Sequence, residues 1–142
     1  MSDGISIDTS SFAKFARGLK EIDPVLKREL RTDLKAAGEI VAADARSNAD
    51  WSTRIPGSIK VSVSGNTIKV VANAKKAPHA KAYEHEGKDG TFRHPVFGDR
   101  TNWVSEPARV FLAKALIANK QAAVEAARVA VRKALEKVHS YL

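Results

Sequence analysis

The sequence predicts an α+β fold, in which helices flank a small antiparallel sheet. Apolar residues recur at helical spacing over residues 24–45 and again toward the C-terminus, and they alternate with polar residues over residues 59–72. We therefore expect N-terminal helices, a small antiparallel sheet built on a β-hairpin, a long partly ordered loop over about 74–106 and a C-terminal helix over about 107–139. The chain has 142 residues, enough to bury one hydrophobic core, so residues 1–142 are expected to form a single domain.

Two helices are expected in the N-terminal part. Apolar residues at three- and four-residue spacing predict the first one, after the capping hydroxyls of residues 9–11: Phe12, Phe15, Leu19 and Ile22. Asp23 and Pro24 end this helix and begin the second, because proline is tolerated at the first helical position. The second helix has an apolar face over about six turns: Leu26, Leu30, Leu34, Ala37, Val41 and Ala45. Its second half is rich in small residues, which allow another backbone to approach closely: Ala36, Ala37, Gly38, Ala42 and Ala43.

A β-hairpin is expected next. Apolar residues occupy alternate positions in two short segments: Ile59, Val61 and Val63, then Ile68, Val70 and Ala72. Gly65 and Asn66 lie between the segments, and a two-residue connection that begins with glycine suits a type II′ turn. An open edge of such a small sheet could extend into the sheet of a neighbouring subunit.

Residues 74–106 show no sustained period of either kind, although they contain three of the four histidines. A loop of this length in a compact domain is unusual, and it tends to be functional or to order on assembly. Pro107 is expected to begin the C-terminal helix, with Ser105 or Glu106 as its cap.

Histidines and carboxylates gather in this loop, which raises the possibility of a metal site: His79, Glu84, His85, Glu86, Asp89 and His94. The histidines are six and nine residues apart, whereas metal-binding pairs on helices have shorter spacings, so an exposed polar loop is the favoured interpretation. Glu84 and Glu86 could form a hydrolytic pair, but no nearby apolar pocket would separate their proton affinities. We expect no catalytic residue, no metal site and no cofactor.

Composition narrows the function classes further. The chain has no cysteine, which excludes disulfides and thiolate zinc sites, and it has no apolar run long enough to cross a membrane. Its net charge is +8, so attraction to polyanions such as nucleic acid is possible. The alternative is that these charges form ordinary solvated helix faces.

Aromatic and apolar residues of the loop alternate with arginines, the composition of an interface hot spot. The alternative is a lid that folds back over the hairpin of the same chain. We predict the following contacts with a neighbouring subunit or partner: Phe92, Arg93, His94, Pro95, Phe97, Arg100, Trp103 and Arg109.

Several segments together resemble a known protein family. They are residues 36–47, which end in Ala45-Arg46-Ser47; Ala77-Pro78-His79-Ala80 with Tyr83-Glu84 and Gly87; and Phe92-Arg93-His94-Pro95-Val96-Phe97-Gly98, followed by Trp103-Val104 and Pro107-Ala108-Arg109-Val110-Phe111-Leu112. In order and spacing, over about residues 9–118, they resemble the head–tail joining and tail-terminator (tail completion) proteins of long-tailed bacteriophages. The resemblance is to the branch found in phages of high-GC Gram-positive hosts.

The resemblance implies a short sheet with helices packed on one face, assembled into a ring that is commonly six-fold. It implies a non-enzymatic virion protein of the tail or neck, assembled in the host cytoplasm. The implied partners are further copies of the chain, the tail tube protein, a head-completion (stopper) or portal-side connector protein, and genomic DNA that passes through the lumen. We expect no membrane to be involved.

A small basic DNA-binding module, similar to nucleoid-associated proteins, is the alternative function. No helix-turn-helix pair supports it, and Glu125 and Glu136 interrupt the basic residues of the last helix. A toxin-like enzyme that uses the histidine-containing loop ranks third.

Overall fold

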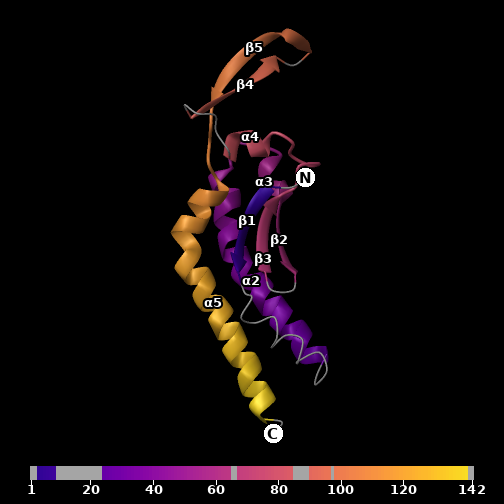
Figure 1. Ribbon diagram of the computed structural model, residues 1–142, viewed down its shortest axis with the longest axis vertical. Helices are drawn as coiled ribbons and strands as arrows, with labels where there is room; N and C mark the ends of the chain where they lie inside the picture. The colour runs from indigo at the N-terminus through magenta and orange to yellow at the C-terminus, as the bar shows by residue number, and fades with distance from the viewer. Residues whose placement is uncertain (1–2, 9–23, 65–66, 85–89, 97, 141–142) are drawn as a thin grey trace.

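The computed structural model describes residues 3–8, 24–64, 67–84, 90–96 and 98–140. Two long helices, α2 (Pro24–Asn48) and α5 (Leu112–Ser140), lie side by side along the molecule (Figure 1). A three-stranded sheet packs against α2, and a separate two-stranded hairpin projects from one end of this body. The predicted α+β class is confirmed.

Helix α2 follows the sequence prediction closely. It begins at Pro24 and runs for 25 residues, and all six apolar residues of the predicted face are buried. The first predicted helix, with Phe12, Phe15, Leu19 and Ile22, lies outside the described residues.

The two long helices run antiparallel, as their cross-contacts show. Glu29 pairs with Lys137 and Asp33 with Lys133 near one end, whereas near the other end Asn119 donates to Asp44 at 2.7 Å. The buried seam of α5 is mostly alanine: Ala115, Ala123, Ala127, Ala130 and Ala134. Such short side chains let the helix axes come close and leave little room for a ligand between them.

The sheet comprises β1 (Asp3–Asp8), β2 (Ile59–Ser64) and β3 (Thr67–Ala72), in the antiparallel order β1-β3-β2. The predicted hairpin is confirmed as β2 and β3; Ser64 pairs with Thr67, and the expected turn at Gly65 and Asn66 lies outside the described residues. Strand β1 was not predicted. One face of β2 and β3 is buried on the helix side, whereas Lys60, Ser62 and Ser64 on the other face are exposed. The helices therefore cover one face, as the resemblance implied.

Gly38 is the point of closest approach between α2 and the sheet. A Cβ atom at this position would lie 2.6 Å from Val61 Cγ1 and 2.8 Å from Ile68 Cγ2, distances that require the neighbours to move. At this position the small residue of α2 makes room for side chains of the hairpin, those of Val61 and Ile68.

Replacing Gly38 with alanine is expected to lower the free energy of unfolding by about 1–2 kcal/mol. Overpacking a core costs ~1–3 kcal/mol, and the better helix propensity of alanine offsets at most ~1 kcal/mol of that cost. Urea unfolding measures the change. Gly57→Ala is the control, because nothing lies within 4 Å of its added Cβ; equal stability of the two variants would contradict the prediction.

The expected loop over about 74–106 needs correction. It contains a short helix, α4 (Ala80–Glu84), and the strands β4 (Thr91–Val96) and β5 (Asp99–Pro107), which pair antiparallel. No strand was predicted here because β5 is exposed along nearly its whole length, so no apolar face imposes a two-residue alternation on its sequence.

The start of the C-terminal helix also needs correction. Helix α5 begins at Leu112 and not at about 107, because Pro107 is the last residue of β5. Neither Ser105 nor Glu106 caps it, since both belong to β5. The cap comes from a distant residue, as described below.

Candidate assembly interface

The hairpin of β4 and β5, here called the arm (residues 91–107), projects from the end of the body (Figure 1). Every residue from Asp99 to Ser105 is exposed. Because the arm extends away from the helices and the three-stranded sheet, both of its faces are open to solvent along β5.

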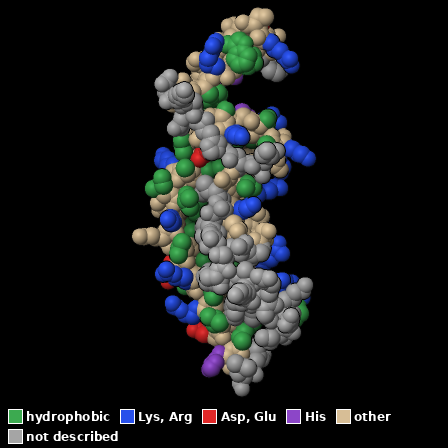
Figure 2. Space-filling view, in the orientation of Figure 1, with side chains coloured by type: hydrophobic (Ala, Val, Ile, Leu, Met, Phe, Trp, Pro, Cys, Tyr) green, Lys and Arg blue, Asp and Glu red, His purple; other side chains and the backbone are tan. Residues whose placement is uncertain are grey.

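The outer part of the arm combines apolar and basic side chains. Trp103 lies opposite Pro95 in the strand pairing, its side chain is 49% exposed, and its indole N–H donates to the Arg100 carbonyl at 3.0 Å. Arg93 and Arg100 are exposed. The space-filling view shows hydrophobic surface between basic side chains at the far end of the arm (Figure 2).

Tyr83 of α4 is the centre of the contacts that join the arm to the body. Its ring lies edge-on to Phe92 of the arm, with centroids 4.8 Å apart, and 4.6 Å from the ring of Trp51. Its hydroxyl donates to Glu106 Oε2 at 2.7 Å. The Arg109 guanidinium lies 4.9 Å from the centroid of Trp51, a cation–π contact.

We call Trp51, Tyr83, Phe92, His94 and Glu106 the anchor. His94 and Glu106 form an ion pair when the histidine is protonated. His94 Nδ1 lies 3.0 Å from the Pro95 carbonyl and Nε2 lies 3.1 Å from Glu106 Oε1. Both ring nitrogens therefore face acceptors, and the protonated ring can donate a hydrogen bond to each of them.

These contacts shift the pKa values of the anchor. The hydrogen bond to the Pro95 carbonyl is the largest cause that raises the pKa of His94 above its ordinary value, and the hydrogen bond to Glu106 is the next. Hydrogen bonds from Tyr83 and then His94 lower the pKa of Glu106. Burial, followed by the bond to Glu106, raises the pKa of Tyr83.

These shifts predict that the arm is held most firmly at mildly acidic pH. A raised pKa in the folded state means that the contribution of His94 is present below its ordinary value of 6.5 and is lost as the pH rises through the folded pKa. The lowered pKa of Glu106 means that its contribution is present above 4.5 and is lost as the pH falls through the folded pKa. Hydrogen exchange of the β4 amides, corrected for intrinsic rates, should show more protection at about pH 5.5 than at about pH 8. His94→Gln should abolish the difference, and equal protection in the native chain would contradict the prediction.

Glu84 is the cap of α5. One carboxylate oxygen accepts from the N–H groups of Phe111 at 2.8 Å and Leu112 at 3.0 Å, and the other accepts from Ala113 at 2.8 Å. The backbone N–H of Arg109 donates to the Tyr83 carbonyl at 3.1 Å. The first N–H groups of a helix have no partners within the helix, and its N-terminus carries partial positive charge. A carboxylate at this place accepts hydrogen bonds from those N–H groups and also compensates the positive charge. Glu84, which the sequence suggested as a ligand or acid, therefore has a structural role.

The structure separates the predicted contact residues into two groups. Phe92 and His94 belong to the anchor, Arg109 lies beside it, and the Pro95 carbonyl contacts His94. Arg93, Arg100 and Trp103 lie on the arm away from these contacts, and Phe97 lies outside the described residues. Because Trp103 is half exposed, the alternative of a buried lid over the hairpin is wrong for this residue. Trp51, Tyr83 and Glu106 were not among the predicted contact residues, because no spacing in the sequence connects them.

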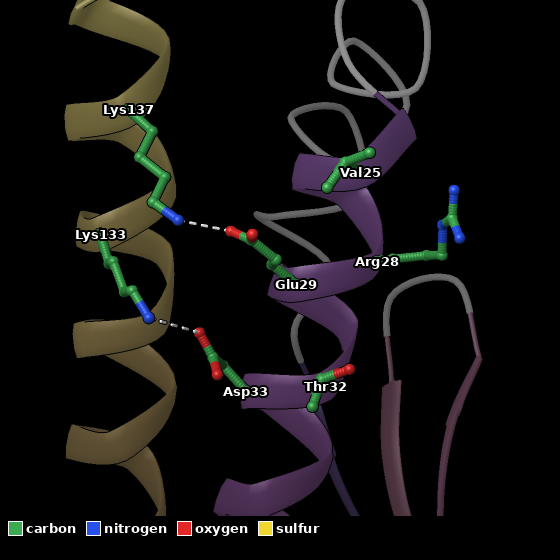
Figure 3. Close-up of a pocket in the computed structure, with 7 residues that line it drawn as sticks. All are labelled: Val25, Arg28, Glu29, Thr32, Asp33, Lys133 and Lys137. Atoms are coloured by element: carbon green, nitrogen blue, oxygen red, sulfur yellow. Dashed lines mark hydrogen bonds and ion pairs between the residues drawn. The ribbon is translucent and has the colours of Figure 1, made fainter.

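No metal site is evident among the described residues, where no three histidines, cysteines or carboxylates are grouped to hold an ion; His85, Glu86 and Asp89 lie outside them. A shallow groove between α2 and α5 is lined by Val25, Arg28, Glu29, Thr32, Asp33, Lys133 and Lys137. Two ion pairs cross it, Glu29 with Lys137 and Asp33 with Lys133 (Figure 3). Both carboxylates are therefore paired with lysines of the other helix, and these ion pairs connect α2 to α5. This arrangement has the form of a helix–helix contact and not of an acid–base pair.

The comparisons with known proteins agree with a structural role. The family model described as "Bacteriophage HK97-gp10, putative tail-component" matches residues 13–85. No curated protein and no solved structure matches the chain. The match covers just over half of the chain and ends directly after Glu84, so the arm and α5 lie beyond it. The chain belongs to the HK97-gp10-like family of phage tail components.

Proposed function

We propose that this tail component is a subunit of a ring at the head end of the tail, where it acts as a tail terminator or as a neck connector between tail and head. The observation that carries the proposal is the arm. It is fastened to the body at its base and exposes Trp103, Val104 and two arginines beyond it.

Physical chemistry supports an assembly role for the arm. An isolated two-stranded hairpin is at best marginally stable in water, and it needs further strands or a packing surface. The exposed tryptophan and arginines are the residue types that dominate interface energetics. In this proposal Arg93, Pro95, Phe97, Arg100 and Trp103 contact a partner, and Phe92, His94 and Arg109 hold the arm in position for it.

A closed ring needs a heterologous contact, in which one patch of each subunit binds a different patch of the next. An arm at one end and a separate body supply two such patches, and a six-fold ring is the expected form. The tail tube protein would lie below the ring and a stopper or portal-side connector protein above it. The net charge of +8 is compatible with genomic DNA that passes through the lumen.

This role requires no catalytic centre, cofactor or membrane. In the described residues, no helix combines the length and the apolar character that spanning a bilayer requires. The proposed place of action is the virion tail or neck, after assembly in the host cytoplasm.

Deleting the gene from the phage or prophage that carries it tests the proposal. Electron microscopy should show DNA-filled heads separate from tails, and a plasmid copy of the gene should restore joined virions. Tails that grow past their normal length would assign the terminator role, whereas separate tails of normal length would assign the connector role. Infectious, fully joined virions that lack the protein would refute both.

A further inference from the structure

We propose that the free edge of β5 pairs with the free edge of β2 in a second copy of the chain, so that each arm extends the sheet of its neighbour. This inference rests on the proposed ring function and names the contact that would close the ring.

Backbone directions identify β5 as the edge of the arm that can accept another strand. The Ala108 N–H donates to the Gly90 carbonyl at 2.9 Å, and hydrogen-bonded pairs alternate with non-hydrogen-bonded pairs along an antiparallel ladder. Counting along the β4–β5 register from the hydrogen-bonded pair Gly90–Ala108, the pairs Arg93–Ser105 and Pro95–Trp103 are non-hydrogen-bonded. The backbone groups of these four residues therefore point away from the partner strand, toward the free edges of the arm. Pro95 therefore removes a donor from the free edge of β4, as proline commonly does at protected edges.

The corresponding edge of β5 has no such protection at its centre. Trp103 and Ser105 each direct an N–H and a C=O outward, and no other described residue forms a hydrogen bond with these groups. Toward the tip, the Thr101 N–H is occupied by Asp99 Oδ1 at 2.9 Å. At the base, Pro107 has no N–H. The free part of this edge is therefore centred on Trp103 and Ser105.

Among the described residues, β2 is an edge strand of the three-stranded sheet and offers an edge that matches β5. The Asn73 N–H donates to the Ser58 carbonyl at 3.0 Å, so by the same alternation Ile59, Val61 and Val63 direct their backbone groups outward. The Ile59 carbonyl is already occupied by Arg46 Nη2 at 2.9 Å. Within the described part of the chain, the free part of β2 is therefore centred on Val61 and Val63, with the same two-residue spacing as on β5.

An antiparallel pairing matches these groups one to one. Trp103 then lies opposite Val63 and Ser105 opposite Val61, each pair exchanging two backbone hydrogen bonds, while Val104 lies opposite Ser62 in the non-hydrogen-bonded pair between them. Residues directly opposite each other lie on the same face of a sheet. Trp103 would therefore lie on the same face as Val63 of the second copy, which is the face that α2 of that copy covers. The pairing would remove the half-exposed tryptophan from water.

The occupant is a second copy, because one chain carries both edges and cannot join them by itself. Its arm points away from its own β2 (Figure 1). Two different edges on one subunit also meet the requirement for a heterologous contact that closes into a ring.

Disulfide crosslinking tests the register directly, since the chain has no native cysteine. Full-length Ser62→Cys and Val104→Cys variants are purified separately, mixed and oxidised. The predicted pair has a Cα–Cα distance of ~4.5 Å, within the range that a disulfide spans. We expect a covalent dimer of one copy of each variant, identified by mass spectrometry, at least tenfold more abundant than in a control mixture of Val104→Cys with Lys60→Cys. Equal crosslinking in the two mixtures would overturn the pairing, and the absence of any covalent dimer in both mixtures would overturn the choice of a second copy as the occupant.

A backbone variant provides the second measurement. Ser105→Pro removes one outward N–H of β5 and leaves the ladder to β4 intact, whereas Ser105→Ala keeps that N–H. Mass photometry of the full-length chain should show at least a tenfold weaker self-association for the proline variant and no change for the alanine variant. If neither measurement supports the pairing while gene deletion still separates heads from tails, the β5–β2 contact is wrong and the proposed function stands. If deletion leaves virions joined, the function itself fails.

Discussion

Replacing Glu84 with alanine is expected to lower the free energy of unfolding by about 2–3 kcal/mol and the melting temperature by about 10 °C. The change removes one carboxylate that accepts three backbone N–H groups of Phe111, Leu112 and Ala113. Loss of a capping side chain alone costs ~0.5–2 kcal/mol. The cost should lie at or above the top of that range, because the acceptor is charged, accepts three N–H groups and lies at the positive end of a 29-residue helix. Thermal unfolding followed by circular dichroism measures the change.

Glu84→Gln is the matched control for this prediction. Its amide oxygen still accepts hydrogen bonds but carries no charge, and its nitrogen cannot accept the third N–H. We expect roughly half of the destabilisation seen with alanine, together with faster hydrogen exchange at residues 111–113 in both variants. A Glu84→Ala protein within about 0.5 kcal/mol of the native chain would show that water replaces the carboxylate without cost.

Replacing Trp103 with alanine is expected to abolish head–tail joining while the isolated chain stays stable. The side chain is 49% exposed and projects from the arm, so the melting temperature should fall by no more than about 2–3 °C. If the exposed indole is an interface anchor, its loss removes a contact of the kind that costs ~2–4 kcal/mol in binding at a hot spot. Repeated in every subunit contact of a ring, this loss should reduce the yield of infectious particles at least a hundredfold.

Phe111→Ala provides the opposite pattern as a control. Phe111 is fully buried in the body, so the change should cost ~3–5 kcal/mol of stability, as large-to-small core substitutions do. Trp103→Phe should restore part of the joining, since it keeps an aromatic ring on the arm. A Trp103→Ala chain that is strongly destabilised but still joins heads to tails would refute the interface assignment.

Helix α2 and the hairpin of β2 and β3 were predictable because local patterns govern them. Each has one face toward the core and one toward solvent, and burial imposes the period of the element on its apolar residues. Leu26, Leu30 and Leu34 therefore mark the helix, and Ile59 and Val61 mark the strand, before any tertiary information is available.

The arm was not predictable in the same way. Its residues lie on a hairpin with little contact to its own body, so no buried face selects an alternating pattern, and Pro95 inside β4 argues against a strand. Pro95 is nevertheless tolerated because its backbone nitrogen points to the free edge, where the ladder loses no hydrogen bond. The aromatic and arginine content of the segment did indicate contact residues, although it could not separate Phe92 and His94 at the anchor from Trp103 on the exposed surface.

By itself, then, the sequence determined the α+β class, the long second helix, the hairpin after it and the resemblance to phage head–tail proteins, because each of these depends on residues that are close together in the chain or on their order along it. The tertiary structure alone decided that Glu84 caps a helix which begins 28 residues later, that Tyr83 joins Trp51 to Phe92, and that β5 and β2 are edge strands among the described residues. These features depend on partners distant in sequence. No period or spacing encodes such a partner, because the folding of the intervening chain brings the two groups together.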